Sequence, residues 1–227
     1  MTGMLRQVVH KVVYRLYAGP AMARVDHVTM FGLALEVPPT VFHPAFSLTS
    51  RFLGRYLLGL ELRGKRLLDM GCGSGIQGLI AARRGADVTA VDINPVAAAG
   101  TRSNASANHL AGSIRAVEAN LFDGMAEGEL YDYIVWNPPF FAVDPSDIAA
   151  RAWNAGGEFE VIAGFAHGAG AHLAPGGKIV IVLSSDADSG AIRGRFAACG
   201  FREEVARLQR RFFETLSIIV YSREQAP

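Results

Sequence analysis

One stretch of the sequence, residues 65–95, limits the possible folds more than any other part of the chain. It reads KRLLDMGCGSGIQGLIAARRGADVTAVDINP and contains two short apolar runs, which end on the acids Asp69 and Asp92. Glycines follow the first acid, and a helix-like segment, residues 76–84, lies between the two runs. This order predicts a strand, a glycine-rich turn, a helix and a second strand, which is a βαβ unit able to hold a nucleoside cofactor.

The spacing of the glycines separates two classes of nucleoside cofactor. A dinucleotide site has the pattern Gly-x-Gly-x-x-Gly, in which the helix N-terminus faces a pyrophosphate. Here the glycines are Gly71, Gly73 and Gly75, and Asp69 stands two residues before the first of them. A carboxylate there would repel a pyrophosphate but suits the ammonium of an amino acid. S-adenosylmethionine has that ammonium, a ribose and no phosphate, so the pattern favours S-adenosylmethionine as the cofactor.

The end of the second strand supplies the other expected cofactor contacts. Asp92 is placed to accept hydrogen bonds from the ribose hydroxyls, and Ile93 follows it. The glycines of the first turn let the backbone bend sharply and approach a ligand, because a Cβ there would block the approach.

Composition is typical of a globular chain of about one domain. The chain has 227 residues, of which 50% are hydrophobic and 19% charged, and its formal net charge is +1. This balance is too apolar for disorder and gives no general electrostatic reason to bind nucleic acid. Without a long apolar run or a signal-peptide pattern, we expect a cytoplasmic protein with no membrane association. Cys72 and Cys199 lack metal-ligand spacing, so we expect reduced thiols and no metal site.

The remaining periodic segments predict one open α/β sheet. Two strands follow the last helix, which indicates an antiparallel hairpin at one edge of a mostly parallel, seven-stranded, Rossmann-like sheet with helices on both faces. We expect an N-terminal helix and extended cap in residues 1–40 and the cofactor-binding domain in residues 41–227. Helices are expected at residues 4–16, from about Ser47 or Thr49 to 60, and at 76–84, 95–109, 158–173 and 191–199; further strands are expected at 114–119, 131–136, 178–184, 201–208 and 215–221.

A second chemical motif, Asn137-Pro138-Pro139-Phe140, follows the predicted strand 131–136. It therefore lies at the carboxyl edge of the sheet, where open α/β sheets bind ligands. The two prolines fix the backbone, so the Asn137 side-chain oxygen and the Pro138 carbonyl become rigid acceptors. They could hold a planar NH₂ group in line with the methyl donor, with Phe140 against its plane. The alternative is a simple turn after a strand, since Asn and Pro are common turn residues.

The segments DMGCGSG, AVDINP and NPPF, in this order, resemble the class I S-adenosylmethionine-dependent methyltransferases of the HemK-like group. These enzymes methylate the side-chain amide nitrogen of a glutamine in translation release factors. The resemblance covers about residues 41–222 and includes RAWNAGGEFEVIAGF and ETLSIIVY. It is nearest to the short members without the bacterial N-terminal helical domain, some of which work with a small zinc-binding activator protein.

The resemblance implies a role for each matching residue. Asp69 and the three glycines would hold the methionine part of the cofactor, Asp92 the ribose, and Asn120 with Leu121 the adenine. The segment VFHPAFSLT implies a Thr near the cofactor, at Thr49, although this Thr comes one residue later than in the family and Ser47 is its rival. Asn120 also departs from the pattern, because the family usually has Asp there.

The sequence leaves the methyl acceptor open. A protein glutamine amide is the first choice by resemblance, and a small-molecule amine or an exocyclic amine of RNA or DNA could use the same Asn-Pro-Pro chemistry. Nucleic acid is not favoured, because the chain has no basic excess. A different class, a partner protein that binds the cofactor without turnover, is the remaining alternative.

Overall fold

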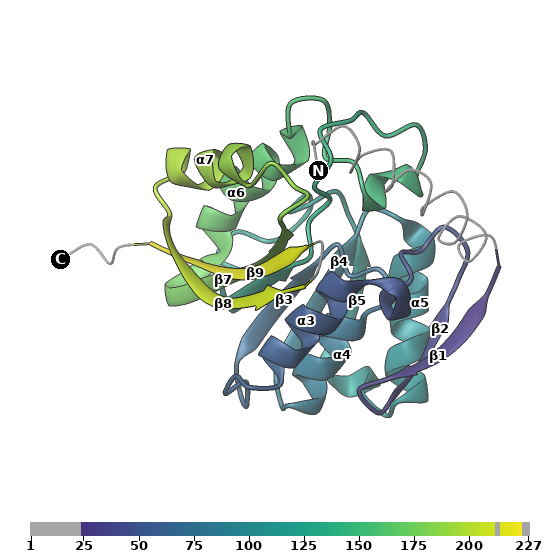
Figure 1. Ribbon diagram of the computed structural model, residues 1–227. Helices are drawn as coiled ribbons and strands as arrows, with labels where there is room; N and C mark the ends of the chain where they lie inside the picture. The colour runs from purple at the N-terminus through teal and green to yellow at the C-terminus, as the bar shows by residue number, and fades with distance from the viewer. Residues whose placement is uncertain (1–23, 212–213, 224–227) are drawn as a thin grey trace.

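A seven-stranded mixed sheet forms the centre of the protein (Figure 1). The computed structural model describes residues 24–211 and 214–223. The strand order is β5-β4-β3-β6-β7-β9-β8. The neighbours from β5 to β7 pair in parallel, whereas β9 runs antiparallel to both β7 and β8. The strands are β3 (Arg66–Met70), β4 (Asp87–Asp92), β5 (Ile114–Glu118), β6 (Tyr131–Trp136), β7 (Leu173–Ser184), β8 (Arg202–Arg210) and β9 (Thr215–Ser222). The predicted parallel sheet with an antiparallel hairpin at its edge is confirmed.

In the part of the chain that the structure describes, five α-helices cover the two faces of this sheet (Figure 1). Side chains of the first three pack with one hydrophobic core cluster, and side chains of the last two pack with a second cluster on the opposite face. The helices are α3 (Leu48–Leu57), α4 (Ile76–Arg83), α5 (Pro95–Ala107), α6 (Glu160–His172) and α7 (Ser189–Ala198), with short 3-10 turns η2 (Pro44–Phe46), η3 (Ala111–Ser113) and η4 (Ala150–Ala152). Within the described ranges, none of these helices has the length and apolarity needed to cross a membrane.

Local sequence signals explain where the helices begin. The Ser47 side chain accepts a hydrogen bond from the Ser50 N–H and caps α3. Asn94 caps α5 in the same way, with Pro95 in the first helical turn. The predicted helix start near Ser47 is thus confirmed, with Ser47 as the cap.

A separate two-stranded hairpin, β1 (Asp26–Met30) and β2 (Leu33–Val37), lies beside α5. Its two-residue turn uses positive φ angles at Phe31 and Gly32. The side chains of Asn104 in α5 and of Asn108 directly after it hydrogen-bond backbone groups of β2. We expected an N-terminal helix and an extended cap within residues 1–40 but no hairpin. The N-terminal helix that we predicted at residues 4–16 lies outside the described residues.

Strand β7 is longer than we predicted. We expected Pro175-Gly176-Gly177 to separate a helix from a strand beginning at Lys178, but α6 passes directly into β7 at Leu173. Leu173 pairs with Tyr131, and the register shifts before Lys178 pairs with Tyr133. The Pro-Gly-Gly segment therefore forms an irregularity within the strand, because the pairing with β6 resumes on both sides of it.

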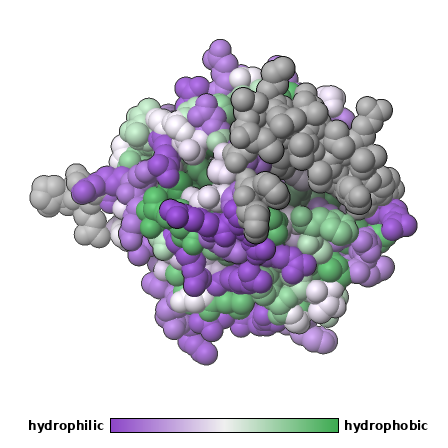
Figure 2. Space-filling model, viewed as in Figure 1, coloured by the Kyte–Doolittle hydropathy of each residue, from purple (hydrophilic) through white to green (hydrophobic). Residues whose placement is uncertain are grey.

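Strand β8 forms one edge of the sheet and is exposed along nearly its whole length. Hydrophilic side chains dominate its surface in Figure 2. Charged residues on an edge strand oppose pairing with other chains, so this edge ends the sheet.

Candidate functional site

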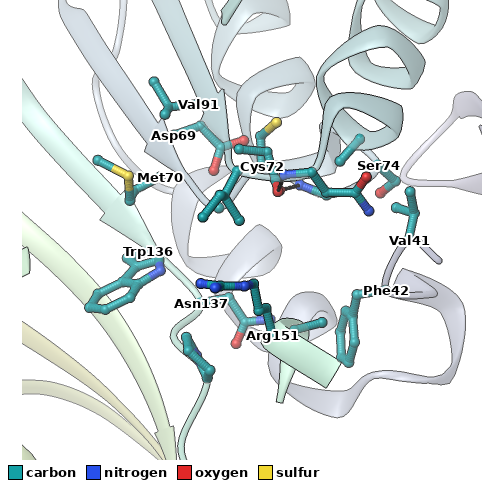
Figure 3. A pocket seen from close by; sticks show the side chains of 18 of the residues that line it. Val41, Phe42, Asp69, Met70, Cys72, Ser74, Val91, Trp136, Asn137 and Arg151 are labelled. Atoms are coloured by element: carbon teal, nitrogen blue, oxygen red, sulfur yellow. Dashed lines mark hydrogen bonds between the residues drawn. The ribbon is translucent and has the colours of Figure 1, made fainter. Parts of the chain in front are cut away.

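A cavity opens at the carboxyl ends of β3, β4 and β6 (Figure 3). Strand β4, which follows β3 along the chain, pairs with one edge of β3, and the later strand β6 pairs with its other edge. Such a reversal of strand order leaves a crevice in which open α/β sheets bind ligands. Among the residues predicted to bind the cofactor or the acceptor, those that line the cavity are Asp69, Gly71, Gly73, Asp92, Ile93, Asn120, Leu121, Asn137 and Pro139.

Two glycines of the glycine-rich turn face the cavity, and the third packs against α5 instead. Gly71, Gly73 and Gly75 all have positive φ angles. Only the first two line the cavity. A Cβ on Gly75 would lie 2.8 Å from two atoms of the Thr101 side chain, so Gly75 allows α5 to approach the start of α4. Its requirement for glycine is one of packing and backbone conformation.

Asp69 is a buried carboxylic acid at the end of β3, with 2% of its surface exposed. Its Oδ2 accepts a hydrogen bond of 2.8 Å from the Gly78 N–H in α4. Burial raises the pKa of Asp69 to about 7, although this hydrogen bond opposes the shift. The acid therefore exchanges its proton near neutral pH, and a cationic group in the cavity would favour its carboxylate form.

Asp92 ends β4 and holds two turns of the backbone in place. Its Oδ2 accepts from the Gly73 N–H at 2.8 Å and its Oδ1 from the Asn94 N–H at 2.9 Å. Burial raises the pKa of Asp92, and the backbone N–H groups partly offset this effect. Each carboxylate oxygen can still accept another hydrogen bond, as contact with a ribose would require.

Asn120 and Leu121 follow β5. Strand β5 pairs with one edge of β4, and β3, which leads into the glycine turn, pairs with the other edge. Leu121 has a positive φ angle of 53°, which turns the chain where it meets the cavity. The Ala119 N–H donates to the Asp92 carbonyl, so the ends of β4 and β5 remain together beyond the strands. These contacts bring Asn120 and Leu121 into the same cavity as Asp92.

Asn137 is the polar residue at the end of β6. Its Nδ2 lies 3.4 Å from the Ser50 Oγ of α3, and its Oδ1 is buried without a hydrogen-bond partner among the described residues. Pro139 lines the cavity with Asn137, whereas Pro138 and Phe140 do not. The Phe140 side chain instead packs against the second hydrophobic cluster.

In the first turn of α3, the residue that faces the cavity is Ser50, whereas we had expected Thr49. The Thr49 hydroxyl bonds to the Ser47 hydroxyl at 2.8 Å, and neither residue lines the cavity. The next residue, Ser50, faces it. A helix advances by about 100° per residue, so a shift of one position changes which side chain reaches the ligand.

Sequence reasoning also missed Gln77 and Arg151. Gln77 is 4% exposed and lines the cavity; its Nε2 donates to the Ser50 carbonyl at 2.9 Å, and its Oε1 has no partner among the described residues. A polar residue within the apolar run of α4 was a usable signal. Arg151, on η4, extends into the cavity (Figure 3). Nothing in its sequence surroundings distinguished it from a surface arginine.

The polar groups of the cavity fit the expected cofactor. The site presents two carboxylates, Asp69 and Asp92, and side-chain oxygens of Gln77 and Asn137 that no other described residue hydrogen-bonds. S-adenosylmethionine brings donors that match such acceptors, namely an ammonium and two ribose hydroxyls. In the part of the chain that the structure describes, no three His, Cys, Asp or Glu side chains are grouped closely enough to hold a metal ion.

Comparison with known proteins gives a family match and several relatives. Residues 38–207 match the family model described as the methyltransferase small domain. The ribosomal RNA small subunit methyltransferase C of Chromohalobacter salexigens is 39% identical over 158 residues, which are 68% of this chain and 43% of that protein. A putative protein N5-glutamine methyltransferase of Methanocaldococcus jannaschii is 28% identical over 194 residues, which are 83% of this chain and 94% of that protein.

A solved structure shows the same fold. The T. thermophilus 16S rRNA N2 G1207 methyltransferase, in complex with AdoMet and guanosine, has a TM-score of 0.67 and 23% sequence identity. The match covers 88% of this chain and 50% of that one. The chain spans less than half the length of the first curated relatives that it matches.

Proposed function

Because the chain belongs to the methyltransferase small domain family, we propose that it transfers a methyl group from S-adenosylmethionine to a planar amide or amine nitrogen. The leading acceptor is the side-chain amide of a protein glutamine. One observation carries the proposal: the Oδ1 of Asn137, which is buried and has no hydrogen-bond partner among the described residues, lies in the same cavity as the two carboxylates Asp69 and Asp92.

The residues around the cofactor would divide its binding among the strand ends. Asp69 and the backbone of Gly71 and Gly73 hold the methionine end, and the unpartnered Oε1 of Gln77 offers the ammonium a further acceptor. Asp92 with Ile93 binds the ribose. The adenine lies at Asn120 and Leu121, which follow β5. When bound, S-adenosylmethionine supplies an activated methyl group on a sulfonium, and the sulfur leaves as a neutral thioether.

Asn137 would hold the acceptor nitrogen. An amide or nucleobase NH₂ is a poor nucleophile, because its lone pair is delocalised into the planar group. A hydrogen bond from one of its N–H groups to the Asn137 Oδ1 fixes its position and stabilises the positive charge that develops on nitrogen. The nitrogen becomes acidic only as the new bond forms, so one N–H proton is lost to water afterwards and no general base is needed before attack.

Support for a glutamine acceptor comes from the extent of one match. The putative N5-glutamine methyltransferase of Methanocaldococcus jannaschii aligns over most of both chains. The Asn137 Oδ1 would hold an amide NH₂ without requiring a nucleic-acid-binding surface, which agrees with the net charge of +1.

A nucleobase exocyclic amine is the second candidate. It is favoured by the higher identity to the ribosomal RNA methyltransferase of Chromohalobacter salexigens, although that match covers 43% of the relative. An exocyclic amine is also a planar NH₂ with a delocalised lone pair, so the Asn137 geometry serves it equally well.

The test uses methyl-labelled S-adenosylmethionine, the purified protein and an extract of cells that lack the gene. The extract is divided into ribonuclease-treated, protease-treated and small-molecule fractions. Label in a protein band that survives ribonuclease is the expected result, and label lost with ribonuclease would favour the nucleobase. If the protein binds the cofactor in calorimetry but transfers label to none of the fractions, the enzymatic function is contradicted.

A further inference from the structure

Arg151 is a cation at the cavity that the proposed chemistry does not use. Its side chain lines the cavity together with Asn137 and Pro139, and Figure 3 shows it extending into that space. Among the described residues it makes no hydrogen bond or ion pair. A guanidinium offers five N–H donors in a planar fork, and no other described residue engages those of Arg151.

The backbone ties Arg151 to the loop that carries Asn137. The N–H groups of Phe140 and Phe141 both donate to the Trp153 carbonyl, at 3.2 and 3.0 Å. The Ala150 N–H donates to the Asp147 Oδ1 at 2.8 Å, which fixes the start of η4. The backbone of Arg151 is therefore held in a set place relative to the Asn-Pro-Pro-Phe segment.

Arg151 is an exposed residue that lines the cavity, so water solvates its guanidinium until a ligand takes the place of that water. Guanidinium pairs favourably with carboxylate and phosphate, often through two parallel hydrogen bonds. We propose that Arg151 binds an oxyanion, a carboxylate or a phosphate, that the methyl acceptor carries beside the nitrogen to be methylated. This inference rests on the proposed methyl transfer and adds a property of the acceptor.

The position of Arg151 favours the acceptor over the cofactor's own carboxylate. The groups expected to hold the methionine end come from β3 and the start of α4, including Asp69 and Gln77. Arg151 instead comes from the segment after β6 and is tied to the Asn137 loop. An anion bound by Arg151 would therefore share the Asn137 side of the cavity with the acceptor nitrogen.

The experiment compares the wild type with Arg151→Gln, Arg151→Lys and a charge-matched control, Arg63→Gln. Arg63 is exposed and lies just before β3, at the end of the sheet away from the cavity. Calorimetry measures the Kd for S-adenosylmethionine, and label transfer to limiting extract measures the reaction. We expect Arg151→Gln to bind the cofactor like the wild type and to lose on the order of tenfold to a hundredfold in transfer, as loss of a charged hydrogen bond predicts. Arg151→Lys should recover part of the loss, and Arg63→Gln should transfer normally.

Two anions serve as probes of the oxyanion itself. Inorganic phosphate and acetate are added to the transfer assay, with sodium chloride keeping the ionic strength equal. Inhibition by phosphate alone would identify a phosphate-bearing acceptor, and inhibition by acetate alone a carboxylate; in both cases the inhibition should be weaker in Arg151→Gln. Equal inhibition of the wild type and the variant, or none in the wild type, would overturn the inference.

Other results separate this inference from the proposed function. Weaker cofactor binding by Arg151→Gln would assign Arg151 to the carboxylate of S-adenosylmethionine and overturn the inference, while wild-type transfer remained. Unchanged transfer by Arg151→Gln would overturn it too. A wild type that transfers no label to any fraction would remove the proposed function and this inference with it.

Discussion

The Ser50 hydroxyl oxygen lies 3.4 Å from the side-chain nitrogen of Asn137, and this contact determines which end of the amide faces the cavity. With Nδ2 directed at Ser50, Oδ1 is the atom left without a partner among the described residues. Ser50 is in turn linked to α4, because its carbonyl accepts from the Gln77 Nε2. The contact thus joins α3, α4 and the end of β6 around one acceptor oxygen.

Removal of the Ser50 hydroxyl should impair the methyl-transfer step. In Ser50→Ala the Asn137 amide can rotate, so we expect kcat to fall by a few-fold to about tenfold, in line with the roughly 0.5–1.5 kcal/mol of a typical hydrogen bond. Ser50→Thr keeps the hydroxyl and should recover most of the rate, while cofactor Kd stays near that of the wild type. In an Asn137→Ala background the Ser50→Ala change should have no further effect. Additive losses in this double-mutant cycle would show that Ser50 does not act through Asn137.

Substitution of Asp92 should weaken cofactor binding. Asp92→Ala removes the expected ribose acceptor and also the partner of the Gly73 N–H, so we expect a loss on the order of 1–3 kcal/mol in calorimetry. Asp87→Ala is the control, because Asp87 is exposed at the opposite end of the same strand. Equal affinities for the two variants would remove Asp92 from the site.

Binding of S-adenosylmethionine should release a proton from Asp69. The pKa of this acid is raised to about 7 by burial, so most of it is protonated at pH 6 in the free protein. An ammonium beside it favours the carboxylate, and we expect release of roughly 0.9 proton per cofactor at pH 6 and almost none at pH 8.5. Calorimetry in buffers of different ionisation enthalpy measures this number. Asp69→Asn should release none, and a wild type that shows no buffer dependence at pH 6 would contradict the contact.

The same acid should make the free protein less stable as pH rises. Its pKa is higher in the folded state than its ordinary value of 3.8, so between about pH 4 and 7 the folded state holds a proton that the unfolded state has lost. The stabilisation is therefore complete below the unfolded pKa and lost as pH rises through about 7. We expect the Tm of Asp69→Asn to exceed that of the wild type by more at pH 8 than at pH 5, because only part of the stabilisation has been lost by pH 5. A Tm difference that is the same at both pH values would show that Asp69 does not titrate in this range.

Gly75 should be required for packing as well as for backbone conformation. Gly75→Ala places a Cβ 2.8 Å from the Thr101 side chain at a φ of 79°, and we expect it to cost about 2–4 kcal/mol of unfolding free energy. Gly64→Ala is the matched control, with a φ of 71° and no atom within 4 Å of the added Cβ. It should show the conformational cost alone, about 1 kcal/mol. Equal losses in denaturant unfolding would mean that the Thr101 contact contributes nothing.

Much of the fold could be predicted because strong local signals agreed with one another. The apolar runs that end on Asp69 and Asp92 become adjacent parallel strands, and the chain alternation places Asn137 at the same edge of the sheet. The β1–β2 hairpin escaped prediction, since its turn residues Phe31 and Gly32 are not the usual Asn-Gly pair. The length of β7 escaped it too, because the pairing with β6 overrides the Pro-Gly-Gly turn signal.

Site residues at strand ends could be predicted from the sequence, whereas site residues on helices and loops were harder to predict. Asp69, Asp92 and Asn137 reach one cavity because strand topology brings them there. Whether Thr49 or Ser50 faces that cavity depends on the rotation of α3, which is set by its packing against the sheet. The place of Arg151 depends on backbone bonds between Trp153 and the residues after Pro139, which no local pattern indicates.

The two hydrogen bonds to the Trp153 carbonyl close residues 142–152 into a loop whose sequence can be changed. The backbone N–H groups of Phe140 and Phe141 bond to Trp153, and these bonds hold the two ends of the loop together without any contribution from the side chains within it. Lengthening the chain at the exposed Ser146 adds little loop entropy and leaves Asn137 in place. A laboratory that wished to redirect the enzyme to a new acceptor could randomise this segment alone and keep the cofactor site as it is.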